Sequence, residues 1–304
     1  MLQNEDALSL ILSRLGLTAG VSTEAAMCGG AWAVNTSGGH TGTFHLVESG
    51  DCWLHLEGSA PRRLHPGDFV LFPRDAGHFL TPEEHIPEGV AVNEAPPIQA
   101  GVPVTRMLCG YIEFRSRAAW PLLDSLPDAF VIDLADSAVG DTRNLLNLLI
   151  SEAFADHPGR SAVIDHLIHV LVVFALRQHI ESGACVGLMA ALADPRLGRA
   201  LSGFHAAPER RWSVDLLAAE ASMSRAAFAA AFKASAGESP MAYVTGWRMQ
   251  MAIDLLTRTD DSMAQIAEAV GYESEAAFRN AFRKVVGQPP GQVRRSRSAA
   301  LTDS

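Results

Sequence analysis

Residues 212–228 read W-S-V-D-L-L-A-A-E-A-S-M-S-R-A-A-F, and a related pattern, I-A-E-A-V-G-Y-E-S-E-A-A-F, returns at residues 266–278. Both copies contain a small residue, a turn and two phenylalanines four residues apart, followed by a glycine and a proline. The offset is 49 residues at the small residue, from Ala218 to Ala267, and 50 from the first phenylalanine onward. A repeat of this length predicts two copies of one structural unit, with one residue inserted in the second turn.

Each copy predicts a short helix, a tight turn and a second helix. Apolar residues recur at helical spacing before the turn, and Ser224 and Ser274 stand where the N-caps of the second helices are expected. The paired phenylalanines then give each second helix one apolar face, and the first copy ends near Gly237. A small residue on the first helix lets the second helix cross it closely. This is the geometry of a helix-turn-helix, whose second helix can enter the DNA major groove.

The motifs between and after the copies are equally specific. Residues 237–249 read G-E-S-P-M-A-Y-V-T-G-W-R-M, and residues 278–290 read F-R-N-A-F-R-K-V-V-G-Q-P-P. Together with the repeat, they resemble the AraC/XylS family of transcription regulators over about a hundred C-terminal residues. The resemblance implies that double-stranded DNA and RNA polymerase are partners, that the protein is a homodimer and that residues 241–256 form one helix between the two units.

We expect the second unit to carry much of the base discrimination. In the first recognition helix only Arg225 offers a strong polar contact, whereas Arg279 and Asn280 in the second have the geometry for guanine and adenine. Arg283 and Lys284, one turn later, are better placed for phosphate; the alternative for these charges is a solvated helix face. The predicted DNA-contacting residues are Ser224, Arg225, Ala226, Ala229, Ala230, Ser274, Glu275, Ala276, Arg279, Asn280, Arg283 and Lys284.

Length and charge indicate two different domains. The chain has 304 residues, 48% of them hydrophobic and 19% charged, values typical of a soluble protein with two domains. Its formal net charge of −10 is uneven: residues 205–304 carry +1 and the first 204 residues carry −11. The asymmetry predicts an acidic domain followed by a near-neutral one. A net charge near zero is a weaker basic signal than most DNA-binding domains give.

The sequence predicts a cytoplasmic protein without a membrane segment. Residues 1–17 contain Glu5 and Asp6 and lack the basic start of a secretory signal. The longest apolar run, Leu167–Leu176, is interrupted by His169 and is too short to span a bilayer. The cysteines form no CxxC pair, which favours reduced thiols over a structural zinc site. They are Cys28, Cys52, Cys109 and Cys185.

The N-terminal part has a different residue pattern, which is typical of β-strands. From Met27 to about Phe114, short alternating segments are punctuated by glycine, which predicts a small antiparallel barrel or jelly roll. Residues 64–73, L-H-P-G-D-F-V-L-F-P, followed by His78, resemble the second motif of the cupins. The resemblance implies a cupin-like β-barrel in which His78 points into the interior.

The metal-binding residues of the cupins are incomplete in this chain. Metal-binding cupins use two histidines one residue apart, a carboxylate and the later histidine. Here Thr43 replaces the first histidine, His45 matches the second, and Glu48 falls short of the carboxylate position. Two histidines are too few for a firmly held divalent ion, so we expect no metal and no other cofactor. His45 and His78 are then pocket-lining or surface polar groups.

Two cysteines flank the predicted barrel. Cys28 precedes Gly29-Gly30, and Cys109 precedes Gly110. They are either buried and inert or a redox-responsive pair; no lysine or arginine adjoins either thiol closely enough to argue for a lowered pKa. The sensor candidates are therefore His45, His78, Cys28 and Cys109, and a small-molecule signal is slightly favoured over thiol oxidation.

Helices follow the barrel. The stripe of apolar residues over Ala162–Glu181 is broader than one core face needs, so this helix either makes the dimer contact or covers the barrel. The fold class is α+β. The predicted division is a cupin-like sensing and dimerisation domain at residues 1–185, a linker at 186–194 and a DNA-binding domain at 195–304, with helix-turn-helix units at about 214–234 and 263–285.

The leading interpretation is a sequence-specific transcription regulator, not an enzyme, controlled by a signal sensed in the cupin-like domain. The alternative is a cupin metalloenzyme, such as an oxygenase, with a helical appendage; the incomplete ligand set counts against it. The sequence leaves open the effector, the operator and whether the protein is an activator or a repressor.

Overall fold

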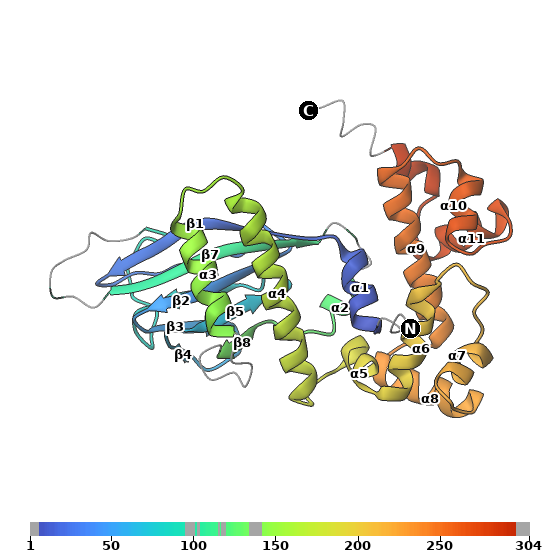
Figure 1. Ribbon diagram of the computed structural model, residues 1–304, viewed down its shortest axis with the longest axis horizontal. Coiled ribbons are helices and arrows are strands. Elements are labelled where there is room, and N and C mark those ends of the chain that lie inside the picture. Colours follow the sequence, from blue (N-terminus) through green and yellow to red (C-terminus); the bar gives the residue numbers. More distant parts are fainter. Residues whose placement is uncertain are drawn as a thin grey trace. The chain divides into compact units, whose positions relative to one another are not determined.

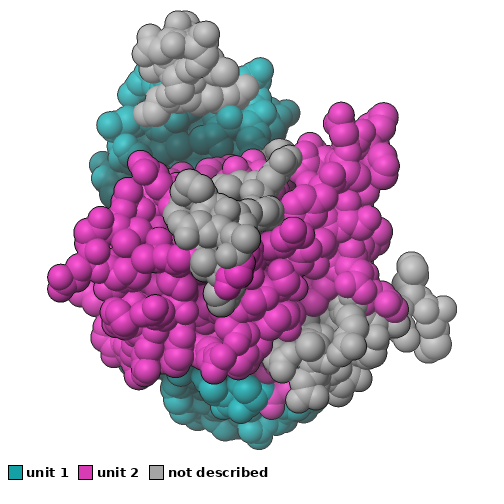
Figure 2. All heavy atoms as spheres, turned by 90° about the vertical axis from the view of Figure 1, so that its left-hand side faces the viewer, with its two compact units in different colours: residues 1–16, 114–125, 182–304 teal, residues 17–113, 126–181 magenta. Residues whose placement is uncertain are grey.

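The computed structural model describes residues 6–94, 101, 104–114, 116, 120–133 and 142–295, with side chains except at 23–29, 120, 133, 142 and 143. The chain forms two compact units, coloured separately in Figure 2. A helical unit comprises residues 1–16, 114–125 and 182–304, and a strand-rich unit comprises residues 17–113 and 126–181.

The strand-rich unit contains two antiparallel sheets (Figure 1). The larger sheet has the order β1 (Leu17–Gly29), β7 (Val104–Phe114), β2 (Gly42–Ser49), β5 (Asp68–Phe72), β8 (Phe130–Asp133). The smaller sheet has the order β4 (Arg62–Leu64), β3 (Cys52–Leu56), β6 (His78–Thr81). Within the described residues the strand ladders form two separate sheets, in agreement with the predicted antiparallel strands, and closure of the barrel stays a prediction.

Apolar side chains from both sheets form one core. Strand β2 is buried over residues 42–47 and β5 over its whole length, because each lies between two neighbouring strands and is covered on both faces. A strand buried on both faces reads as a continuous apolar run rather than an alternating one. The core cluster contains Trp32, Val34, Val47, Cys52, Leu54, Leu64, Val70, Phe72, Leu80, Met107 and Cys109.

Helices α3 (Thr142–Phe154) and α4 (Arg160–Glu181) lie across the β1 side of the larger sheet (Figure 1). At 22 residues α4 is long and apolar enough to cross a membrane, although the apolar run within it is shorter. Six of its residues are instead buried, and the His169 ring Nε2–H donates to the Leu17 carbonyl oxygen of β1 at 2.7 Å. Helix α4 therefore packs as a covering helix, while Val163 and Val170 remain 39% and 40% exposed.

The helical unit begins with α1 (Ala7–Leu15), which packs against α6 (Pro195–Ala206). Ala7, Ile11 and Leu15 form its buried stripe, and Asp6 caps its first turn. This apolar stripe is the physical reason that residues 6–16 group with the C-terminal helices rather than with the strands. The predicted division at residues 185 and 195 remains a prediction about how separate fragments fold.

The remaining helices carry the repeat. The residues predicted as a linker contain α5 (Gly187–Ala193), which buries Leu188, Met189 and Ala191. The helices of the first copy are α7 (Val214–Glu220) and α8 (Arg225–Ala236), and those of the second are α10 (Met263–Ala269) and α11 (Glu275–Val286). Helix α9 (Pro240–Arg258) runs between the copies (Figure 1), and α2 (Trp120–Leu123) is a single turn near α5.

Candidate nucleic-acid interface and histidine–cysteine cluster

The two turns of the repeat have the same backbone hydrogen bond. Met223 N–H donates to the Ala218 carbonyl oxygen at 2.9 Å, and Tyr272 N–H donates to that of Ala267 at 2.8 Å. A left-handed residue follows each first helix, Ser222 with φ of 54° and Gly271 with φ of 79°. The residue inserted in the second copy is therefore Glu273, between this hydrogen bond and the N-cap.

Both recognition helices begin at a capping serine. The Ser224 hydroxyl accepts from Ala227 N–H at 3.3 Å, and the Ser274 hydroxyl accepts from Ala277 N–H at 3.2 Å. Of the other residues predicted to contact DNA, only Ala229 and Glu275 are half-buried. Those exposed to solvent are Arg225, Ala226, Ala230, Ala276, Arg279, Asn280, Arg283 and Lys284.

Acidic partners of the two leading arginines were not anticipated from the sequence. Arg225 pairs with Asp215 of α7, with 2.7 Å between Nη1 and Oδ2. Arg279 Nε donates to Glu275 Oε1, one turn earlier on α11, at 2.6 Å. The spacing of four residues on α11 is the signal that predicts such a pair. Both contacts orient a guanidinium at the exposed face, and a DNA base or phosphate must compete with the carboxylate for it.

Arg248 on α9 contacts both the segment before the first helix-turn-helix unit and the turn of the second. Its guanidinium donates to the carbonyl oxygens of Pro208 at 2.8 Å and Arg210 at 2.6 Å, both before the first unit, and of Gly271 at 3.4 Å in the second turn. The side chain is almost entirely buried, and this burial lowers the pKa of Arg248. Sequence reasoning missed this residue, because its carbonyl partners are not encoded by side-chain type.

A second buried polar contact joins α6 to α9. The His205 ring Nε2 and the Tyr243 hydroxyl are 2.8 Å apart, and both side chains lie in the core of the helical unit. Burial, reinforced by the positive charge of Arg14, lowers the pKa of His205 to about 3. The imidazole is therefore neutral at physiological pH, and it helps to position α9 beneath the recognition helices.

In the strand-rich unit, His45, His78 and Cys109 form one contiguous cluster. His45 on β2 lies opposite Cys109 on β7 in the strand register, and the distance from its Nδ1 to the Cys109 Sγ is 3.0 Å. The His45 Nε2 is 2.8 Å from the His78 Nε2, and the His78 Nδ1 is 2.8 Å from the Ala76 carbonyl oxygen. All three side chains are buried, at 1% exposure or less. Three of the four predicted sensor residues are thus brought together.

The hydrogen bonds assign which ring nitrogens of this cluster carry a proton. The Ala76 carbonyl can only accept, so the His78 Nδ1 carries a proton and its Nε2 accepts when the ring is neutral. His45 then donates through Nε2, which leaves its Nδ1 to accept the Cys109 thiol proton. Burial and the neighbouring His78 hold the pKa of His45 well below its ordinary value, and burial also lowers the pKa of His78. Cys109, His45 and His78 therefore form a chain of neutral donors and acceptors.

We expect this assignment to be visible by long-range ¹H–¹⁵N NMR of the histidine side chains. His45 should be the Nε2–H tautomer and His78 the Nδ1–H tautomer at pH 7, because burial disfavours the cationic forms. Neither signal should move as the pH falls from 7 to 6. A cationic His45 or His78 at pH 7 would contradict the assignment.

The same geometry argues against a metal centre. His45 directs its two ring nitrogens at different neighbours, so its lone pair and those of His78 and Cys109 do not converge on one point. Thr43 donates its hydroxyl to Asp75 Oδ1 at 3.2 Å, and the other Asp75 oxygen accepts the backbone N–H groups of residues 38–40. Among the described residues, no three His, Cys, Asp or Glu side chains are arranged to hold a metal ion.

The other predicted sensor residue and the surrounding histidines lie elsewhere. The side chain of Cys28 falls outside the described residues. His40 and His65 are exposed, and His55 is half-buried with its Nε2 2.7 Å from the Thr81 hydroxyl. A cavity of about 440 Å³ lies beside His78. Its lining includes Asn35, His55, Leu56, His78, Phe79 and Ile86.

Comparison with known proteins matches both parts of the chain. Residues 6–181 match the Cupin family, and residues 217–296 match a helix-turn-helix domain. A protein of Streptomyces lividans described as an AraC-like transcription regulator is 33% identical over 310 residues, covering 96% of this chain and 97% of that protein. The HTH-type transcriptional regulator MtrA of Neisseria gonorrhoeae is 30% identical over 282 residues, covering 88% and 91%. The DNA-binding domain of AdpA, solved with a target DNA, matches at 28% identity and a TM-score of 0.33, over 34% of this chain and 95% of that domain.

These matches cover the chain almost from end to end and confirm the resemblance seen in the repeat. The relatives are transcription regulators, so they give no support to the alternative of a cupin metalloenzyme. The cupin match also accounts for the two sheets, and the helix-turn-helix match for the repeated helices. The chain belongs to the AraC-like family of transcription regulators, with an N-terminal cupin domain followed by a DNA-binding helix-turn-helix domain.

Proposed function

We propose that the protein regulates transcription by placing α8 and α11 in successive major grooves and that a signal received in the cupin domain controls this binding. The observation that carries the proposal is the buried Arg248, whose carbonyl partners lie just before the first helix-turn-helix unit and in the turn of the second. Two units held in one arrangement by α9 require two sub-sites at a defined separation. One helical turn of DNA, about 10 bp, is the natural spacing for neighbouring grooves.

In this proposal, helix α11 makes most of the base-specific contacts. Arg279 and Asn280 are exposed next to each other on its first turns, and they are the side chains that match guanine and adenine. Helix α8 offers Arg225 among alanines, which supply contacts to a thymine methyl group but no paired hydrogen bonds. Arg283 and Lys284 lie in the last turn of α11, where they suit phosphate contacts.

Single substitutions test whether α11 contributes more base recognition than α8. Arg279→Ala or Asn280→Ala should weaken binding by about 1–3 kcal/mol and relax the preference at one or two base positions. Lys284→Ala should weaken all sequences alike and reduce the salt dependence, because it removes a phosphate contact. The measurement is binding-site selection followed by affinity titration at two salt concentrations.

Arg225→Ala is the matched control on the first unit, since it too removes an exposed arginine paired with a carboxylate. It should change affinity more than sequence preference. If Arg225→Ala weakens the base preferences in the sequence logo and both α11 substitutions leave them unchanged, the first unit makes most of the base-specific contacts instead.

A small molecule is the favoured signal. The cavity beside His78 is within the usual range of ligand pockets, about 300–1,000 Å³, and its lining combines apolar and polar side chains. A ligand that contacts His78 also acts on His45 and Cys109, because the three are joined by hydrogen bonds. The signal would then pass into β2 and β7, the two central strands that carry His45 and Cys109.

Oxidation of Cys109 is the second candidate, and the contact with His45 is the observation that supports it. An adjacent imidazole can accept the thiol proton and so promote the thiolate, which is the reactive form. The burial of Cys109 counts against rapid reaction, because an oxidant must first reach the core.

The Cys109→Ser variant separates the two triggers. Reporter transcription should still respond to the inducing ligand in Cys109→Ser if the trigger is a small molecule, and a response to hydrogen peroxide should be absent from the wild type. An oxidant response in the wild type that is lost in Cys109→Ser would establish the thiol as the trigger. Cys52→Ser, another buried cysteine of the same core, is the matched control.

The proposal includes a cytoplasmic homodimer that contacts RNA polymerase. Helices α3 and α4 expose Leu148, Phe154, Val163 and Val170, a larger set of apolar side chains than a solvated face needs. Val163→Glu should lower the sedimentation coefficient toward that of a monomer, whereas Val186→Glu, which is 62% exposed on the helical unit, should not. Equal sedimentation of the Val163→Glu variant and the wild type would remove these helices from the interface.

A further inference from the structure

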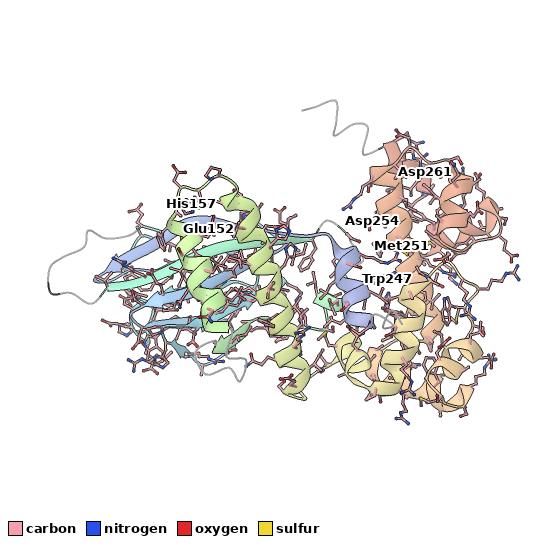
Figure 3. All side chains as sticks on the ribbon, in the orientation of Figure 1. Glu152, His157, Trp247, Met251, Asp254 and Asp261 are labelled. Carbon is pink, nitrogen blue, oxygen red and sulfur yellow. The ribbon has the colours of Figure 1, made fainter. Side chains whose placement is uncertain are left out.

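A cavity of about 370 Å³ lies within the helical unit, among α1, α9, α10 and the segment at Ser116. Its floor comes from α9, where Trp247, Met251 and Asp254 follow one another at helical spacing (Figure 3). Leu255 and Ala269 add further apolar surface. The cavity belongs to neither site described above.

The polar side chains that line the cavity differ in how many hydrogen bonds they make. The Ser116 hydroxyl donates to Asp254 Oδ2 at 2.5 Å, so the carboxylate at the floor already has a partner. Arg14 makes only long contacts, 3.5 Å to the His205 carbonyl oxygen and 3.9 Å to the Met251 sulfur. Arg258 forms no hydrogen bond or ion pair with any side chain in the described part of the chain. Two guanidiniums with unused donors therefore border an apolar cavity.

We propose that this cavity binds a small amphiphilic monocarboxylate, with its apolar body against Trp247, Met251 and Leu255 and its carboxylate between Arg14 and Arg258. Guanidinium groups are the side chains best suited to a carboxylate, because they offer paired donors in a planar fork. Burial raises the pKa of Asp254, and the Ser116 hydroxyl and Arg258 act in the opposite direction. A shared proton or hydrogen bond at Asp254 reduces its repulsion of the ligand.

The size of the cavity limits the ligand. At the lower end of the usual range for ligand pockets, about 300–1,000 Å³, it suits a single ring or a medium alkyl chain and excludes a nucleotide cofactor. Such a ligand bridges α1 to α9, the helix that spaces the two helix-turn-helix units. The site would therefore give the DNA-binding part a ligand response of its own, separate from any signal in the cupin domain.

Octanoate is the probe, with 1-octanol as its neutral analogue of the same chain length. Calorimetry on the full-length protein should show saturable octanoate binding that is at least tenfold tighter than that of 1-octanol. In protein labelled with ¹³C at the methionine methyl groups, octanoate should shift the Met251 resonance, assigned from Met251→Leu. This readout separates the cavity from the one beside His78.

Arg14→Gln with Arg258→Gln should weaken octanoate binding at least tenfold without changing the unfolding midpoint, because both side chains are exposed. Arg196→Gln with Lys233→Gln, two exposed cations outside the cavity, is the matched control and should bind octanoate like the wild type. Equal binding of octanoate and 1-octanol, an unmoved Met251 resonance, or the same loss in the control pair would overturn the proposal.

Discussion

Replacing Arg248 with methionine is expected to lower the free energy of unfolding of the helical unit by about 3 kcal/mol, since three backbone carbonyl oxygens lose their donor at once. Methionine fills a similar volume, so the loss reports mainly on the hydrogen bonds rather than on a cavity. The contact with the Pro208 carbonyl oxygen is buried, and those with the carbonyl oxygens of Arg210 and Gly271 are part-buried, so solvent replaces the guanidinium incompletely. Urea unfolding followed by tryptophan fluorescence measures the change.

The same substitution should weaken binding to an operator with two sub-sites more than binding to one sub-site. The reason is geometric, because Arg248 joins the segment before the first unit to the turn of the second unit. In that turn, Gly271 leaves no room for a Cβ beside the Glu209 carbonyl oxygen. Arg258→Met, an exposed position on the same helix, is the control and should alter the free energy of unfolding by less than about 0.5 kcal/mol. Wild-type stability in Arg248→Met would show that the carbonyl contacts contribute nothing.

Lowering the pH from 7 to 5 is expected to cost the helical unit about 2 kcal/mol through His205 alone. Its pKa is about 3 in the folded protein, against 6.5 for an unperturbed histidine, and burial is the main cause. The unfolded state therefore binds a proton between these values while the folded state does not. Stability from this group is fully present above pH 6.5 and is lost as the pH falls toward 3.

His205→Gln provides the comparison, because glutamine does not titrate and can still reach the Tyr243 hydroxyl. The free energy of unfolding of wild type and variant should differ more at pH 7 than at pH 5, by about 2 kcal/mol. His205 is the sole histidine in the sequence of the helical unit, so His45 and His78 affect both proteins equally. Parallel pH profiles for the two proteins would mean that His205 is not held neutral by the fold.

The helix-turn-helix repeat could be predicted from the sequence because its determinants are local. Capping serines, paired phenylalanines four residues apart and a small residue before each turn act within one or two helical turns. Exposure of Arg279 and Asn280 follows from the same helical period, since the phenylalanines face the core. The cupin-like strands were predictable for a similar reason, as alternation and turn residues also act over short distances.

The contacts that join these parts were decided by the tertiary structure. Cys109 lies 64 residues from His45, and His78 lies 33 residues from it, so their meeting depends on how β2, β6 and β7 pack. The packing also directs the two ring nitrogens of His45 at different neighbours. Residue types alone contain no information on such directions.

The sequence by itself determined the helices of the repeat and which of their faces are exposed, because periodicity and capping are properties of neighbouring residues. Only the tertiary structure decided that α1 belongs with the helical unit, that Arg248 joins the segment before the first helix-turn-helix unit to the turn of the second, and that His205 is neutral. Each of these depends on burial and on backbone carbonyl groups from distant segments. Burial sets the protonation of a side chain and the strength of its hydrogen bonds, and it exists only once the chain has folded.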